Sequence, residues 1–355
     1  MTTGRTKFAP ELNEKQLEGV LATEGPVLVL AGAGSGKTRL LTYKIAHIIL
    51  ELGIDPGSIL GVTFTNKAAG EMKERVRKLC GDSLKGIWLG TFHSICGRIL
   101  RRDGHLVGLK ENYSIYDADD QKRLMRDIMA DAGMDTKSQN PKSILGWISN
   151  KKNGLYDAEV YLSGAIAPKE KTNAGLWVAY QSALRSNNAV DFDDMINLTV
   201  KLLSEHLDVR DYYRNKFQYL LVDEFQDTNR AQYEFVKQLT GANTNITVVG
   251  DDDQSIYRFR GAYDGNVDEF AGHYDDHIRV VLEENYRNPG TILRIARQLM
   301  ECAKGSYTKN LRPKSGEGGP VIVAECGNEN VEAGYVADQI ESLMEEGFLP
   351  GDIAI

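Results

Sequence analysis

The sequence predicts an α/β fold, in which helices cover both faces of a parallel sheet and a helical region is inserted between strands. Two observations support this prediction. Short β-rich apolar runs recur, and each is followed by a polar turn and a helical pattern, which is typical of parallel sheets. The stretch from about 113 to 188 breaks this rhythm and reads as mostly helical. The apolar runs lie at 27–30, 59–65, 87–89, 219–222, 246–249, 279–282 and 321–324.

Length and composition place the chain among multidomain globular proteins. A chain of 355 residues predicts two or three domains, and 42% hydrophobic with 26% charged residues is ordinary for such proteins. We expect no membrane association, because no apolar run approaches the length of a membrane-spanning helix. The first eleven residues carry charges and a proline, unlike a secretion signal. The four cysteines are far apart and form no C-x-x-C pair. This spacing favours reduced thiols in the cytoplasm over zinc or disulfides.

The charge distribution leaves two interpretations open. A net charge of −8 disfavours nucleic acid as a partner, because phosphate binding requires a basic surface. Residues 61–112, however, hold ten Lys/Arg against five Asp/Glu. On charge alone, a solvated helix face is the simpler explanation of that local excess.

Individual helices can be placed by their periodicity. After Thr65, apolar residues recur at a spacing that places them on one face of a helix. Oppositely charged residues spaced i,i+4 lie on its exposed side and can form ion pairs. The stripe consists of Ala69, Met72, Val76 and Leu79, and the pairs are Glu71–Arg75 and Glu74–Lys78. In the inserted region, Asp117 is a candidate N-cap.

A glycine-rich turn between the first strand and the next helix has the pattern of a phosphate-binding loop. Its residues are Ala31, Gly32, Ala33, Gly34, Ser35, Gly36, Lys37 and Thr38. Glycines let backbone N–H groups surround phosphate oxygens, and the helix N-terminus adds its positive end. Lys37 would reach the β- and γ-phosphates of ATP, and the Thr38 hydroxyl would bind Mg²⁺. A chance glycine-rich turn is the alternative, and the flanking strand and helix disfavour it. The glycine spacing excludes a dinucleotide fingerprint.

Two acidic residues, Asp223 and Glu224, stand directly after the run 219–222. Nucleotide hydrolysis needs one carboxylate near the metal and another that orients and deprotonates water. We therefore predict Asp223 as a metal ligand and Glu224 as the general base. Alone, such a strand end is as often a solvated turn. The phosphate-binding loop favours the catalytic interpretation.

A third motif, Val248-Val249-Gly250-Asp251-Asp252-Asp253-Gln254-Ser255-Ile256-Tyr257-Arg258-Phe259-Arg260-Gly261-Ala262, completes the pattern. Together, these motifs resemble the UvrD/PcrA/Rep family of superfamily 1 helicases, in the family's order and over nearly the whole chain. The resemblance implies a P-loop RecA-like parallel sheet, an inserted helical subdomain and the start of a second RecA-like domain. The first motor domain would comprise 1–112 and 189–280, the insertion 113–188, and the truncated second domain 281–355. The final residues, 351–355, look like a strand that is beginning, so we expect a piece of a longer protein.

The resemblance also implies roles around ATP. Gln16 is similar to the glutamine that reads the adenine edge, since an amide donates and accepts at once. Arg39 and Tyr286 resemble a pair that sandwiches the adenine ring. Gln254 resembles the γ-phosphate sensor, and Arg287 an arginine finger that stabilises transition-state charge. Without this context, Gln16 would read as a surface residue and Arg287 as a surface ion pair.

For DNA, the matching positions are Phe64, Thr65, His93, Tyr257, Phe259 and Arg260. Aromatic rings stack on bases without regard to sequence, which would let an acidic protein hold a single strand. Phe259 departs from the tryptophan that many relatives carry, and has a smaller stacking area. The alternative for Phe64 is a strand core residue. In the insertion, Lys142, Ser143, Lys151 and Lys152 are candidate phosphate contacts, with solvated lysines as the default, and 191–194 is expected only to shape the domain.

The resemblance implies an ATP- and Mg²⁺-dependent 3′ to 5′ DNA helicase. Its partners would be single-stranded DNA, single/double-strand junctions, and repair or replication proteins; the sequence fixes no oligomeric state. The alternative is a fragment that binds ATP and single-stranded DNA but turns over little. A P-loop kinase is disfavoured, because nothing in a kinase explains the segment from Gln254 to Arg260.

Overall fold

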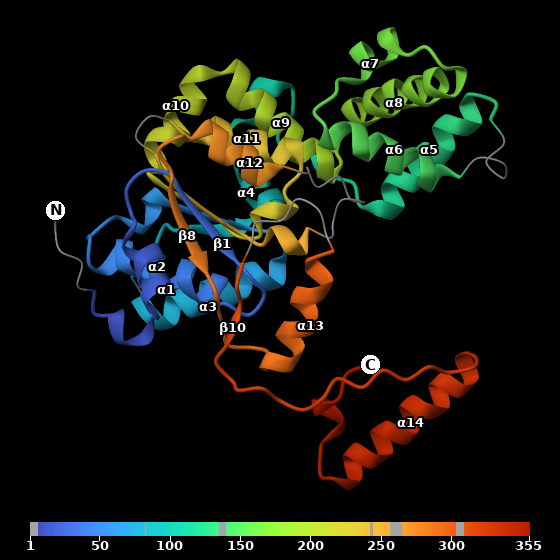
Figure 1. The fold of residues 1–355 in the computed structure, drawn as a ribbon. Helices are drawn as coiled ribbons and strands as arrows, with labels where there is room; N and C mark the ends of the chain where they lie inside the picture. Colours follow the sequence, from blue (N-terminus) through green and yellow to red (C-terminus); the bar gives the residue numbers. More distant parts are fainter. Residues whose placement is uncertain (1–5, 82, 135–139, 242–243, 256–264, 303–308) are drawn as a thin grey trace.

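The computed structural model describes residues 6–81, 83–134, 140–241, 244–255, 265–302 and 309–355. Its centre is a six-stranded parallel sheet (Figure 1). In spatial order the strands are β3 (Trp88–Thr91), β2 (Ile59–Thr63), β6 (Tyr219–Val222), β7 (Asn245–Gly250), β1 (Val27–Ala31) and β8 (Ile278–Leu282). The predicted α/β class with a parallel sheet is confirmed. The predicted boundary after residue 280 falls inside β8, which pairs with β1.

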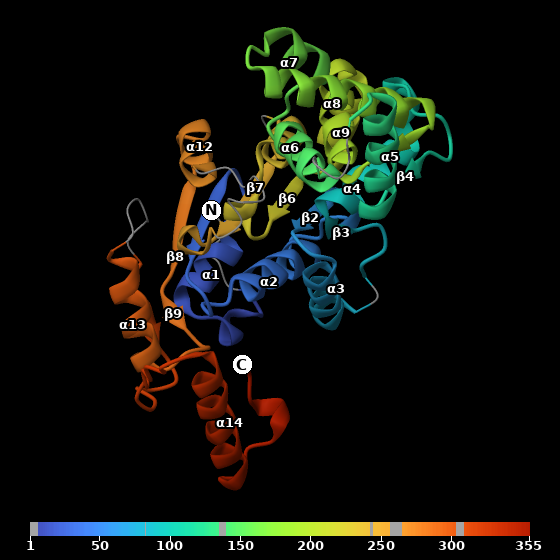
Figure 2. The same cartoon turned by 90° about the vertical axis from the view of Figure 1, so that its right-hand side faces the viewer.

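Helices cover both faces of this sheet, because the strands are apolar on both sides. One core, which includes Val29, Leu40 and Met72, joins the sheet to α1 (Glu14–Leu21), α2 (Lys37–Leu50) and α3 (Asn66–Cys80). The other core includes Phe92, Met195 and Phe235. It packs α4 (Phe92–Asp103), α9 (Phe192–Glu205), α10 (Leu207–Lys216), α11 (Arg230–Leu239) and α12 (Asn266–His273) on the opposite face. The two layers are visible in Figure 2.

The α3 helix illustrates how closely periodicity predicts burial. Ala69, Met72 and Val76 are buried as predicted, and the two predicted ion pairs form, with Glu71–Arg75 at 3.4 Å and Glu74–Lys78 at 2.8 Å. At the C-terminal turn, Cys80 is buried and Leu79 is only partly so. The last turn thus faces the core one residue later than the stripe predicts.

The inserted region is helical, as predicted, and forms a lobe beside the sheet (Figure 1). It contains α5 (Ala118–Asp131), α6 (Pro141–Asn153), α7 (Ala158–Gly164) and α8 (Pro168–Ser186). These helices share a core of their own around Met125, Ile148 and Trp177. Asp117 caps α5, as predicted, and accepts hydrogen bonds from the backbone N–H groups of Asp119 and Asp120. Short parallel strands, β4 (Ser114–Ile115) and β5 (Ala189–Val190), pair where the chain enters and leaves the lobe.

Lys152 is not the phosphate contact that the sequence suggested. Its ammonium is buried and lies 2.7 Å from Asp191 Oδ2 and 2.8 Å from Asp194 Oδ1. The Tyr180 hydroxyl and the Gln181 amide also donate to these two carboxylates. Lys152 therefore joins α6 to the start of α9, and 191–194 does shape the domain, as predicted.

We expect Lys152→Met to lower the free energy of unfolding by about 3–5 kcal/mol, because it leaves two buried carboxylates without their cation. Lys151→Met is the matched control. Lys151 is less buried and lies 4.8 Å from the Tyr161 ring centre, and among the described residues it joins no buried ion pair, so its loss should cost far less. Urea denaturation of both variants measures the difference. Equal midpoints would contradict the structural role of Lys152.

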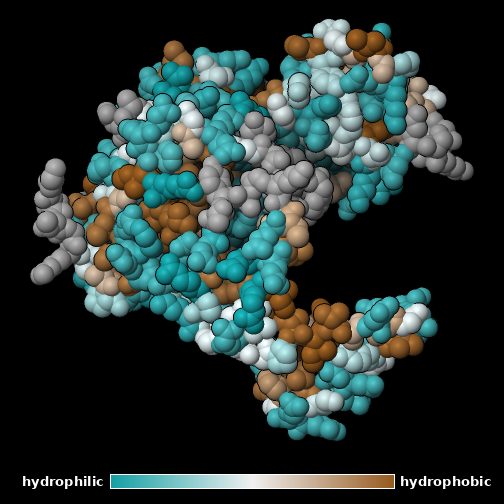
Figure 3. Space-filling model, viewed as in Figure 1, coloured by the Kyte–Doolittle hydropathy of each residue, from teal (hydrophilic) through white to brown (hydrophobic). Residues whose placement is uncertain are grey.

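The C-terminal part contains β9 (Glu284–Asn285), α13 (Gly290–Met300), β10 (Arg312–Pro313) and α14 (Glu329–Glu345), and β9 pairs with β10. The strands predicted at 321–324 and at the final residues, 351–355, are wrong. Among the described residues, neither segment pairs with another strand, and Val323 is 92% exposed. Apolar side chains gather on the surface of this part (Figure 3). Within the described residues, no helix has the length and apolar character that crossing a bilayer requires.

Candidate nucleotide-binding site

The glycine-rich loop lies between β1, in the interior of the sheet, and the start of α2. Gly34 and Gly36 have φ values of 71° and 89°, a region that only glycine adopts readily. The Ser35 hydroxyl donates to the Gly32 carbonyl at 2.7 Å and holds the turn closed. The first backbone N–H groups of α2 have no partner within the helix, so the loop presents a positive helix end at the carboxyl edge of the sheet. This geometry suits a phosphate group.

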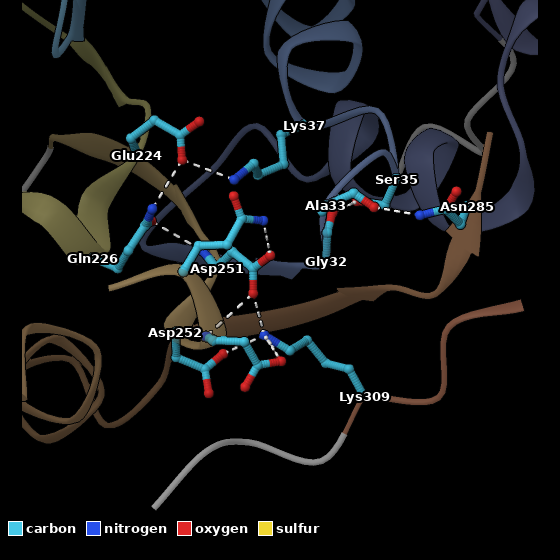
Figure 4. Close-up of polar contacts among 12 residues, drawn as sticks. Gly32, Ala33, Ser35, Lys37, Glu224, Gln226, Asp251, Asp252, Asn285 and Lys309 are labelled. Carbon is cyan, nitrogen blue, oxygen red and sulfur yellow. Dashed lines mark hydrogen bonds and ion pairs between the residues drawn. The ribbon is translucent and has the colours of Figure 1, made fainter. Parts of the chain in front are cut away.

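Lys37 and Glu224 meet at the mouth of this loop. Lys37 Nζ lies 2.8 Å from Glu224 Oε2 (Figure 4). Glu224 follows β6 and has φ 50° and ψ 45°, the left-handed region that a non-glycine residue rarely occupies. Burial opposes ionisation of Glu224. The Lys37 cation and hydrogen bonds from Gln226 and Lys37 nevertheless hold its pKa below the ordinary value. Glu224 is therefore an ionised acceptor beside the loop.

Asp223 is the more deeply buried of the two acids. Burial, reinforced by the negative charge of Glu224, raises the pKa of Asp223 to about 7, and the Lys37 cation only partly offsets this rise. The Asp223 carboxylate and the Thr38 hydroxyl are hard oxygen donors of the kind that Mg²⁺ prefers. The donor set at the end of β6 and the start of α2 therefore fits this ion.

We expect Asp223→Asn to stabilise the metal-free protein increasingly as the pH rises. A buried acid with a raised pKa stabilises the fold below its unfolded-state pKa and loses that contribution as the pH rises through its folded-state value. The variant's gain should therefore be about 2–3 kcal/mol larger at pH 8 than at pH 5. Chemical denaturation in EDTA at both pH values measures it. A gain that is the same at both pH values would contradict the buried, proton-binding state of Asp223.

A chain of hydrogen bonds links the ends of β6 and β7. Gln226 Nε2 donates to Glu224 Oε2 at 2.9 Å, and Gln226 Oε1 accepts from the Asp251 backbone N–H at 2.9 Å. Asp251 Oδ2 in turn accepts from Gln254 Nε2 at 2.5 Å. The predicted sensor, Gln254, is thus connected to the predicted base, Glu224, through two side chains.

The segment after β8 contacts the glycine-rich loop directly. The Tyr286 backbone N–H donates to the Gly34 carbonyl at 2.9 Å, and Asn285 Nδ2 donates to the Ala33 carbonyl at 2.5 Å. A Cβ atom on Gly34 would lie 2.6 Å from Arg287 Cβ. Arg287 also contributes to lowering the pKa of Glu224. The structure therefore brings the predicted arginine finger to the loop.

The predicted adenine-binding residues are engaged with protein groups in this structure. Gln16 is buried, donates to the Ser35 carbonyl at 3.0 Å, and completes the capping box of α1. Arg39 donates to the Glu11 carbonyl and lies 5.0 Å over the Tyr43 ring. Tyr286 is half exposed, and its hydroxyl is bonded to Asn13 and Glu284. Their roles toward adenine stay predictions.

The predicted DNA residues lie at the carboxyl ends of β2 and β3. Phe64 is partly buried, and Thr65 is exposed and caps α3. His93, near the start of α4, packs edge-on against Phe192 with ring centres 5.7 Å apart. Burial lowers the pKa of His93 and so favours its neutral ring. The other predicted positions, Tyr257, Phe259 and Arg260, lie outside the described residues.

Sequence reasoning missed two residues near these sites. Phe192 is 45% exposed and faces His93. In the sequence, a phenylalanine among three aspartates at the start of a helix could have marked it as an exposed aromatic residue. Lys309 contacts Asp251, Asp252 and Asp253, and nothing in its local sequence marked it.

Comparison with known proteins agrees with this geometry. Residues 12–275 match the model of the UvrD/REP helicase N-terminal domain, and 280–355 match the UvrD-like helicase C-terminal domain. The chain is 44% identical over 336 residues to the ATP-dependent DNA helicase PcrA of Bacillus subtilis (strain 168), covering 95% of this chain and 46% of that protein. The proteins of the same name from Leuconostoc citreum and Staphylococcus aureus (strain Mu50 / ATCC 700699) are 42% and 43% identical. Those alignments cover 94% and 97% of this chain and 45% and 47% of the relatives. The chain thus spans about half the length of the curated relatives it matches.

Proposed function

Since the chain belongs to the UvrD/REP helicase family, we propose that it forms the ATP-hydrolysing part of a 3′ to 5′ DNA helicase that moves on single-stranded DNA. The observation that carries this proposal is the meeting of Lys37 and Glu224 at the mouth of the glycine-rich loop, with Arg287 brought to the same loop. Phosphoryl transfer requires a cation that binds phosphate, an ionised group that accepts a proton from water, and a second cation.

In the proposed reaction, Lys37 leaves Glu224 and binds the β- and γ-phosphates. Glu224, released from this ion pair, orients the attacking water and accepts its proton. Arg287 neutralises charge on the transferred group. Mg²⁺, held by Thr38 and Asp223, would supply further charge neutralisation when bound. Gln16, Arg39 and Tyr286 would bind adenine, and Gln254 would sense the γ-phosphate.

We assign DNA to the carboxyl edge near β2 and β3, through Phe64, Thr65 and His93, and add Phe192 to this set. Phe192 supports the assignment because its exposed ring stands beside His93 and can present a stacking face. Tyr257, Phe259 and Arg260 complete the proposal from sequence. The same proposal includes binding to single/double-strand junctions and to repair or replication proteins, and a cytoplasmic location. It also includes the predicted division into motor domains and a helical insertion.

Titration of a fluorescent oligonucleotide tests the DNA part. We expect Phe192→Ala to weaken single-strand binding by about 5- to 150-fold, because base–aromatic stacking contributes about 1–3 kcal/mol. Tyr212→Ala, another exposed aromatic residue, is the control and should bind as the wild type does. No measurable single-strand affinity at low salt would refute the DNA assignment.

The second candidate function is ATP and DNA binding without appreciable turnover. The alignment covers about half of the relatives' length, and under this candidate function the groups that complete hydrolysis lie in the part of those proteins beyond the alignment. Mixing the chain with the separately produced C-terminal half of the Bacillus subtilis relative separates the two. Turnover that appears only on mixing would support the binding function.

A further inference from the structure

Lys309 lies among three consecutive acidic side chains that follow β7. Its Nζ is 2.5 Å from Asp251 Oδ1, 2.5 Å from Asp252 Oδ1 and 3.0 Å from Asp253 Oδ2 (Figure 4). The Lys309 side chain is only 2% exposed. A single ammonium thus holds three carboxylates together in a setting with little water to screen their repulsion.

The same cluster is connected to the proposed catalytic base. Asp251, held by Lys309 through Oδ1, accepts from Gln254 through Oδ2. The Asp251 backbone N–H donates to Gln226, and Gln226 donates to Glu224. Figure 4 shows this path from Lys309 toward Glu224 and Lys37. Displacement of Asp251 would therefore affect both the sensor and the base.

Leu311, two residues after Lys309, contacts the glycine-rich loop. Leu311 packs on Gly32 so closely that a Cβ atom on Gly32 would lie 2.5 Å from Leu311 Cδ2. Between these contacts is a cavity of about 220 Å³, bounded in part by Gly32, Gln254 and Lys309. Residues 309–311 thus touch the phosphate-binding loop and the sensor segment at once.

We propose that Lys309 is a positioning residue of the nucleotide site. By holding Asp251, it fixes Gln254 and, through Gln226, the carboxylate of Glu224. This inference rests on the proposed ATP hydrolysis and names a residue that acts on that site without touching the nucleotide. It also makes residues 309–311 a part of the site, because Lys309 and Leu311 contact the sensor segment and the glycine-rich loop.

Three variants test the inference. Lys309→Met keeps the length of the side chain without the charge, and Lys309→Arg keeps the charge. Lys201→Met, an exposed lysine of α9, is the control. Two readouts are measured in each: ATP hydrolysis with separate kcat and KM, and amide hydrogen exchange of a peptide covering 250–255. Within that peptide, the backbone N–H groups of Asp253 and Gln254 donate to Asp251.

In Lys309→Met we expect exchange of this peptide to accelerate on the order of tenfold. We expect kcat to fall on the order of tenfold with KM changed less than about twofold, because misplaced catalytic groups reduce the rate more than binding. Lys309→Arg should recover most of both values, and Lys201→Met should match the wild type.

Unchanged exchange in Lys309→Met would overturn the inference, whether or not the wild type hydrolyses ATP. An unchanged kcat in a wild type that does hydrolyse would overturn it as well. If kcat and exchange change as much in Lys309→Arg as in Lys309→Met, the side chain acts by packing and the positioning role is wrong. If the wild type does not hydrolyse ATP but exchange is faster in Lys309→Met, the proposed function is overturned. The ion pair of Lys309 with Asp251 would still be supported as the contact that positions this segment.

Discussion

Lys37→Ala is expected to weaken ATP binding and hydrolysis together. Lys37 begins α2 and is the cation at the mouth of the glycine-rich loop, 2.8 Å from Glu224. Its removal deletes a charge-assisted contact to phosphate and leaves the carboxylate of Glu224 to repel an anionic ligand. We expect ATP affinity to fall at least about tenfold and kcat/KM at least about a hundredfold.

Isothermal titration with MgATP and a phosphate-release assay measure these losses. Lys78→Ala removes an exposed lysine of α3 that pairs with Glu74, and this matched control should retain both properties. Thermal unfolding confirms that the Lys37 variant is folded. An ATP affinity unchanged in the Lys37→Ala variant would show that the loop does not bind phosphate in the proposed way.

Glu224→Gln should separate binding from hydrolysis. The glutamine keeps the size of the side chain and an oxygen that can accept from Gln226 and Lys37, but it cannot take a proton from water. Loss of a general base costs about 10²- to 10⁴-fold in rate. ATP affinity should be retained or increased, since one negative charge near the triphosphate is removed.

Single-turnover hydrolysis and MgATP titration of the same Glu224→Gln sample make the comparison. Glu205→Gln, an exposed acid of α9, serves as the control. A Glu224→Gln protein that hydrolyses ATP at the wild-type rate would rule out Glu224 as the base. One that no longer binds ATP would show that Glu224 acts in binding instead.

The central sheet and its loop were predictable because their signals are local. A strand such as β1 and the loop that follows it are determined by neighbouring residues in the sequence. The same is true of the cap at Asp117 and of the ion pairs of α3. The strand predicted at 321–324 fails for the opposite reason. Apolar β-rich residues form a strand only beside another strand, and this segment has none within the described part of the chain.

The misjudged and missed residues depend on contacts that are distant in sequence. Lys152 meets Asp191 and Asp194 about 40 residues later, and Lys309 meets Asp251 58 residues earlier. A lysine in isolation reads as a solvated charge, and only the fold reveals the carboxylates that bury it. The loop pattern located Lys37, the acidic strand end located Glu224, and the family resemblance located Arg287. The side chains that hold them, Gln226 and Asn285, became visible only in the structure.

The most direct test of the proposed motor site is steady-state phosphate release by the wild-type chain with MgATP, with and without single-stranded DNA. The proposed function predicts turnover that rises severalfold or more on addition of DNA and is lost in both Lys37→Ala and Glu224→Gln. Turnover that DNA does not change, or that survives in either variant, would contradict it.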